Sequence, residues 1–118
     1  SADPHRLTLM LFDGALVSIN AARIHMENGE IPLKGTSISK AIEIIANGLK
    51  VSLDFDVGGE LAQRLASLYD YMCARLLHAN ARNDIGALGE VATLLRELKE
   101  AWEQIGKPHS AGNAGAAS

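Results

Sequence analysis

The chain has few of the residues that would support a disulfide-stabilised or aromatic-rich protein. Its 118 residues include one cysteine, Cys73, three prolines and only 4% aromatic residues. A single cysteine excludes an internal disulfide framework and is typical of a reducing compartment. With so few aromatic side chains, the core of this single domain must be aliphatic, which suits packed helices.

Other absences narrow the choice of partners. The formal net charge is -3, and lysine and arginine are scattered among acidic residues. The chain has no basic patch that would neutralise several phosphates, which argues against nucleic acid as a partner. No apolar run approaches the roughly 20 residues of a membrane span, and the segment from Ser1 to His5 lacks the regions of a signal peptide. We therefore expect a cytoplasmic protein without membrane insertion.

No arrangement of side chains predicts catalysis or a cofactor. None of the four histidines follows a glutamate by three residues, as a di-iron bundle site requires. Phosphotransfer bundles carry a helical histidine two residues before Leu-Lys-Gly, but Ile31 stands at that place before Leu33-Lys34-Gly35. A phosphotransfer relay through His25 or His78 is therefore the weakest alternative. We predict a protein that is not an enzyme and binds no metal or other cofactor.

Apolar residues that recur every three or four positions predict four helices. Short connections make neighbouring helices antiparallel. The fold class is therefore all-α, an antiparallel up-down four-helix bundle over residues 1–106, followed by a flexible Gly/Ala/Ser-rich tail at 107–118. The first helix is predicted to start at Asp3-Pro4 and to end at Asn28-Gly29. After a connection at 31–35, Thr36 or Ser37 caps the second helix, and the third starts at Gly58-Gly59. The fourth starts at Asn83-Asp84 and ends at Gly106.

The helices carry more apolar residues than one inward seam can use. Tyr69 and Tyr71 point about 200° apart on a helix, so at most one of them can be central in the core. The surplus predicts an exposed apolar groove for an amphipathic partner helix. The alternative is a non-catalytic bundle that buries the surplus in a self-interface, as a homodimer. The predicted binding positions are Phe12, Leu16, Ile44, Val51, Leu61, Leu65, Leu68 and Tyr71.

Short fragments from about residue 3 to residue 105 form a recognisable set. They are Pro4-His5-Arg6-Leu7 with Leu11-Phe12-Asp13-Gly14-Ala15-Leu16, Lys34-Gly35 with Ile38-Ser39-Lys40-Ala41, Ser52-Leu53-Asp54, Gly58-Gly59-Glu60-Leu61, Leu68-Tyr69-Asp70-Tyr71-Met72, Asn83-Asp84, and Leu94-Leu95 with Leu98 and Ala101-Trp102. In this order and spacing, the set resembles the flagellar secretion chaperone family, FliS.

The resemblance implies a cytosolic chaperone that binds the C-terminal segment of newly made flagellin. The bound segment, part helix and part extended, would wrap the bundle and fill apolar grooves, which masks the site that drives filament polymerisation until export. Components of the export apparatus are a further class of partner that the resemblance implies. Family members usually carry a further N-terminal stretch before the position of Asp3, and the tail at 107–118 has no counterpart in the family.

Overall fold

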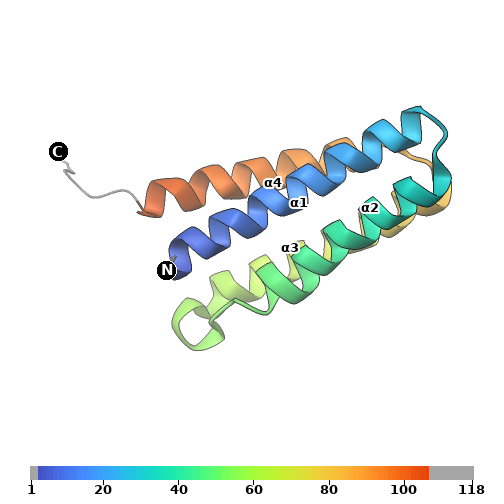
Figure 1. Ribbon diagram of the computed structural model, residues 1–118. Helices are drawn as coiled ribbons and strands as arrows, with labels where there is room; N and C mark the ends of the chain where they lie inside the picture. The colour runs from blue at the N-terminus through green and yellow to red at the C-terminus, as the bar shows by residue number, and fades with distance from the viewer. Residues whose placement is uncertain (1–2, 107–118) are drawn as a thin grey trace.

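A computed structural model describes residues 3–106 of the chain, and these residues form helices without strands. The order is α1 (Pro4–Glu27), α2 (Ile31–Ile44), the π-helical η1 (Ile45–Lys50), α3 (Phe55–Arg82) and α4 (Ile85–Gly106). Helix α1 packs between α2 and α4, and α3 closes the ring between the same two neighbours. Figure 1 shows α1 and α4 in one layer and α2 and α3 in the other. The predicted four-helix bundle is confirmed.

Capping side chains set several helix ends where the sequence predicts them. Asp3 accepts a hydrogen bond from the Arg6 amide at 2.8 Å, and Pro4 occupies the first turn of α1, where no amide donor is needed. Asp84 accepts from the Ala87 amide at 3.2 Å at the start of α4. Helix α4 is described as far as Gly106. The predicted tail at 107–118 lies outside the described residues, so the boundary of the bundle at 106 stays a prediction.

The predicted connection at 31–35, with a cap at Thr36 or Ser37, is wrong. Helix α2 begins at Ile31, and Pro32 lies in its first turn, where a proline is compatible with helical geometry. The connection between α1 and α2 is only Asn28 to Glu30. The Glu30 carbonyl accepts from the Lys34 amide at 2.9 Å, which starts the helical hydrogen-bond pattern.

The core is aliphatic, as the composition predicts. Its largest fully buried side chains are Ile38, Ile45, Met72, Leu76, Leu88, Val91 and Leu95. Tyr69 is buried and Tyr71 is exposed, so only one of the two tyrosines enters the core. Tyr71 instead donates a hydrogen bond to Glu90 on α4.

Helix α1 is more apolar than we expected from the sequence. By length and composition alone it could cross a membrane, so the expectation that no apolar stretch reaches that length is wrong. The core helix of a globular bundle meets the same criterion. One face of α1, with Phe12, Ala15, Ile19 and Ala22, is buried against the other helices, whereas Met10 and Val17 on another face are exposed.

Candidate functional site

The bundle has one open end, where the start of α1, the end of α4 and the connection from η1 to α3 lie together (Figure 1). At this end the helices leave an apolar cavity of about 230 Å³ that is open to solvent. We call it the end cavity. Its lining residues come from every helix except α2: Thr8, Phe12, Leu49, Ser52, Leu53, Leu61, Leu65, Tyr69, Leu98, Ala101, Trp102 and Ile105.

Two adjacent glycines shape the α3 wall of the end cavity. Asp54 caps the first turn of α3 by accepting from the amides of Asp56 and Val57 at 3.0 and 3.1 Å. Gly59 then breaks the helix with φ 50° and ψ -124°, a conformation that side-chain-bearing residues rarely adopt. A Cβ on Gly58 would lie 2.9 Å from the Ala62 Cβ, so this position also requires glycine. The break sets the direction of the helix that carries Leu61 and Leu65.

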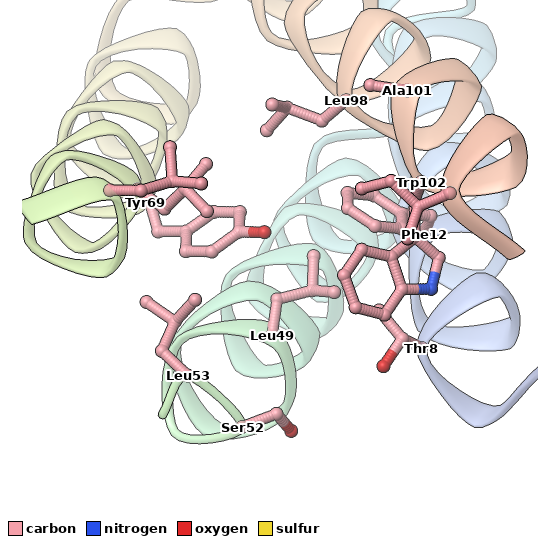
Figure 2. A pocket seen from close by; sticks show the side chains of 12 residues that line it. Thr8, Phe12, Leu49, Ser52, Leu53, Tyr69, Leu98, Ala101 and Trp102 are labelled. Atoms are coloured by element: carbon pink, nitrogen blue, oxygen red, sulfur yellow. The ribbon is translucent and has the colours of Figure 1, made fainter. Parts of the chain in front are cut away.

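The π-helical segment η1 forms the wall opposite α4. A π turn carries one residue more than an α turn and is frequent at functional sites. Leu49 of η1 lines the cavity, and Leu53 follows it in the connection to α3 (Figure 2). Gly48 allows the close approach of α1, since a Cβ there would lie 3.0 Å from a Leu11 methyl group.

A reciprocal clasp between His5 and Trp102 closes one side of the cavity mouth. The two rings stack with centroids 5.1 Å apart and an interplanar angle of 11°. His5 Nε2 donates to the Trp102 carbonyl at 2.7 Å, and Trp102 Nε1 donates to the His5 carbonyl at 3.1 Å. Gly106 completes the clasp, because a Cβ there would overlap the His5 ring at 2.1 Å. The clasp therefore holds Trp102 as a fixed wall.

Among its described lining residues, the end cavity contains one buried side-chain hydroxyl, that of Tyr69, which can act as a hydrogen-bond donor to a ligand. Tyr69 is 4% exposed, and burial raises its pKa to about 12, so the phenol stays neutral. Figure 2 shows the hydroxyl directed into the cavity, toward Phe12 and Trp102. Within residues 3–106 the structure gives this hydroxyl no hydrogen-bond partner. A ligand that excludes water from the cavity must offer it an acceptor or leave it unsatisfied.

The predicted binding residues do not form one site. Three of them line the end cavity: Phe12, which is 2% exposed, Leu61, which is 64% exposed, and the half-buried Leu65. The other five lie elsewhere. Leu16 borders a groove between α1 and α4, Val51 borders a shallow groove with Phe55, Ile44 and Leu68 pack against the core, and Tyr71 is hydrogen-bonded to Glu90.

Sequence reasoning missed most of the cavity wall. Helical spacing in the sequence includes Leu49, Leu98, Trp102 and Ile105, but this spacing does not give their position along the bundle. In an up-down bundle the first residues of α1 and the last residues of α4 meet at one end. Apolar side chains at those ends could have been identified as an unfilled mouth on that basis.

The described residues offer little for covalent chemistry. Within residues 3–106 no group of three histidine, cysteine, aspartate or glutamate side chains converges to hold a metal ion. His25 pairs with Glu30 at 2.8 Å and His78 with Asp84 at 3.1 Å, both at the surface near helix ends. The candidate site is therefore an apolar binding surface.

Comparison with known proteins shows where this architecture belongs. The family described as "Flagellar protein FliS" matches residues 1–109. The chain belongs to the FliS family. It is 54% identical over 105 residues to the flagellar secretion chaperone FliS of Salmonella typhimurium strain LT2, which covers 89% of this chain and 78% of that protein.

Further relatives are similar over the same region. The flagellar secretion chaperone FliSB of Pseudomonas aeruginosa PAO1 is 50% identical over 104 residues, covering 88% of this chain and 82% of the relative. The flagellar secretion chaperone FliS of Bacillus subtilis strain 168 is 38% identical over 104 residues, covering 88% and 76%. Membership in this family of secretion chaperones makes the chain a member of a non-enzymatic class of protein, as the sequence predicts.

Proposed function

We propose that this protein binds the C-terminal segment of flagellin in the cytoplasm, prevents its premature polymerisation and keeps it competent for export. The observation that supports this function is the end cavity, an apolar opening of about 230 Å³ at the end of a bundle that belongs to a family of flagellar secretion chaperones. Delivery of the bound client to components of the export apparatus is part of the same proposal.

The apolar lining of the end cavity favours an apolar side chain of the client as its ligand. A dry cavity of about 150 Å³ holds one benzene ring, so the end cavity accommodates one large or two small apolar side chains. The client contributes a backbone carbonyl as the acceptor for the Tyr69 hydroxyl. Because a disordered client must fold as it binds, ordering entropy offsets much of the contact energy, and the complex remains releasable.

Calorimetric titration tests the proposal. The titrant is a C-terminal flagellin peptide of roughly 40 residues, about 60 Å long if helical at 1.5 Å per residue. We expect saturable binding with a large negative change in heat capacity, the mark of apolar burial. A folded protein that gives no heat of binding, at several temperatures, would contradict the proposal.

The substitution Leu65→Asp locates the binding site. Leu65 is half-buried in the cavity wall, so a carboxylate there would have to be desolvated when the client binds. We expect a loss of about 3 kcal/mol or more of binding free energy, roughly 100-fold in affinity. The matched control is Leu77→Asp, on an exposed part of the same helix. Equal affinity of both folded variants would place the client on another surface.

A further inference from the structure

The polar groups around the end cavity leave one hydrogen bond for a ligand to complete. Of the hydroxyl groups in its described lining, those of Thr8 and Ser52 donate to the backbone carbonyl four residues earlier, at 3.1 and 2.6 Å. The indole N–H of Trp102 donates across the clasp. Tyr69 is the exception, since its side chain is only 4% exposed and its hydroxyl has no partner from residues 3–106. A buried donor without a partner indicates a site for an acceptor.

The lining of the end cavity carries no charge. None of the side chains that line it within residues 3–106 is acidic or basic. An ion that entered would lose its hydration without gaining a partner of opposite charge. Because burial raises the pKa of Tyr69 to about 12, its phenol remains a neutral donor. The cavity therefore selects a neutral molecule that has a hydrogen-bond acceptor.

The size and the walls of the end cavity favour an aromatic ring. Its volume of about 230 Å³ exceeds the roughly 150 Å³ of a dry cavity that holds benzene, which leaves room for a short substituent. Figure 2 shows the Tyr69 hydroxyl facing the rings of Phe12 and Trp102, with Leu98 and Leu49 on either side. Aromatic rings pack well against one another in edge-to-face and offset arrangements. A ring between these walls can place an acceptor at the hydroxyl.

The end cavity is formed without a ligand. The clasp between His5 and Trp102 fixes one wall, and the break at Gly59 sets the direction of the helix that carries Leu61 and Leu65. The mouth is open to solvent, so a small molecule can enter without unfolding of the bundle. Sites for small molecules are typically of this kind, preformed and apolar with a few placed polar groups.

From these observations we propose that the end cavity binds a free small molecule, a neutral aromatic compound whose acceptor takes the hydrogen bond from Tyr69. Such a compound offers a ring and an acceptor without the cost of ordering a chain. It occupies the cavity in place of the client and so lowers the affinity for the client. This displacement rests on the proposed function, whereas binding of the compound does not.

Acetophenone and ethylbenzene are suitable probes, because they have similar shapes and only acetophenone carries an acceptor. An NMR titration follows the indole N–H signal of Trp102, which is the only tryptophan of the chain and lies in the cavity wall. Both probes should shift this signal saturably. Benzoate also has a similar shape but carries a charge, so it should leave the signal unchanged at the same concentrations.

The substitution Tyr69→Phe separates the hydrogen bond from burial of the ring. The variant should bind acetophenone about fivefold more weakly, because the carbonyl loses its donor. It should bind ethylbenzene equally well or more tightly, because no buried hydroxyl is then left without a partner. Tyr71→Phe removes a hydroxyl that donates to Glu90 outside the cavity. This matched control should bind both probes like the wild type.

Three results of these titrations would overturn the inference. One is a Trp102 signal that neither neutral probe shifts, as when a segment outside residues 3–106 fills the cavity. Another is a Tyr69→Phe variant that changes the affinity for both probes by the same factor or for neither, since acetophenone would then not pair with Tyr69. The last is a shift with benzoate as large as that with acetophenone, since the site would then not select neutral molecules.

Calorimetric titration of the flagellin peptide in the presence of acetophenone tests the displacement. At ten times its own Kd, acetophenone should weaken peptide binding by up to about tenfold, whereas benzoate should have no effect. Equal peptide affinity with and without bound acetophenone would overturn the displacement. A peptide that does not bind at all would contradict the proposed function and the displacement with it. The probe titrations would still decide whether the cavity binds small molecules, so the two proposals fail separately.

Discussion

The two ends of the bundle differ in how their polar groups are satisfied. At the closed end, between α1 and α2 and between α3 and α4, a lysine side chain is 3% exposed. This side chain, Lys34, donates from Nζ to the Asn80 carbonyl and to Asn83 Oδ1, both at 2.8 Å. The positive charge also lies at the C-terminus of α3, where the helix dipole favours a cation.

The open end has the opposite character. Its walls are apolar, and the buried hydroxyl of Tyr69 has no partner from residues 3–106. Helix α2 continues into the π-helical η1 at this end, and α3, which starts there, is broken at Gly59. One end is therefore completed by its own hydrogen bonds, whereas the other leaves apolar surface and a donor for a ligand. Stability and binding should be separable along the length of the bundle.

The largest effect on stability is expected from Lys34→Met. The substitution keeps most of the side-chain volume but leaves the Asn80 carbonyl and the Asn83 side chain without their donor. Because hydrogen bonds from charged groups are stronger than neutral ones, we expect unfolding free energy to fall by about 3 kcal/mol. Urea unfolding measures this change.

The control for this substitution is Lys40→Met, at an exposed site on the same helix, which should change stability by less than about 0.5 kcal/mol. The affinity of the folded Lys34→Met variant for the flagellin peptide should be close to that of the wild type. A variant that is stable but binds poorly would show that the two ends are coupled.

The next effect is expected from Gly59→Ala, at the open end. Alanine at φ 50° and ψ -124° is strained, so we expect a loss of about 2 kcal/mol in unfolding free energy. The affinity for the peptide should fall as well, since the break orients Leu61 and Leu65. Gly89→Ala is the matched control, because that glycine lies inside α4 with open space around its Cβ. It should stabilise the protein by about 1 kcal/mol. The same sign for both variants would contradict the assigned role of Gly59.

A smaller effect, on binding alone, is expected from Tyr69→Phe. Loss of the hydroxyl should weaken binding of the flagellin peptide by about 1 kcal/mol, roughly fivefold, because the client carbonyl loses its donor. Stability should be unchanged or slightly higher, since an unpartnered buried hydroxyl is removed. Tyr71→Phe removes a hydroxyl that donates to Glu90 outside the cavity and should leave peptide affinity unchanged. If both variants bind the peptide like the wild type, the client does not pair with Tyr69.

The features that sequence could predict are those determined by neighbouring residues. Capping by Asp3 and Asp84 depends on contacts within a few positions, and both caps are where the pattern places them. Lys34 shows the limit. In sequence, Pro32-Leu33-Lys34-Gly35 resembles a connection, whereas its structural role depends on acceptors 46 and 49 residues away.

The candidate site was predictable only in part for the same reason. The surplus of apolar residues on one helix predicted Leu61 and Leu65 as binding positions. Trp102 enters the cavity wall through its clasp with His5, which is 97 residues away. The π turn at Ile45–Lys50 has no local signature that separates it from the α-helix before it. Apolar periodicity identifies a helix face, but the position of an opening along the bundle depends on how four helix ends meet.

The smallest effect is expected at Glu90, on the exposed side of α3 and α4 between the two ends. Hydrogen bonds from Tyr71 and then Arg75 lower the pKa of Glu90 from its ordinary value of 4.5. A carboxylate with a lowered pKa in the folded state stabilises the protein above pH 4.5, and this contribution is lost as pH falls through the lowered pKa. The stability advantage of the wild type over Glu90→Gln should therefore be larger at pH 6 than at pH 3, as urea unfolding at both pH values would show.

Glu97→Gln, on an exposed site of α4, should show no such dependence. A difference between the wild type and Glu90→Gln that stays constant with pH would mean that solvent screens the interaction completely and that this contact does not contribute to stability.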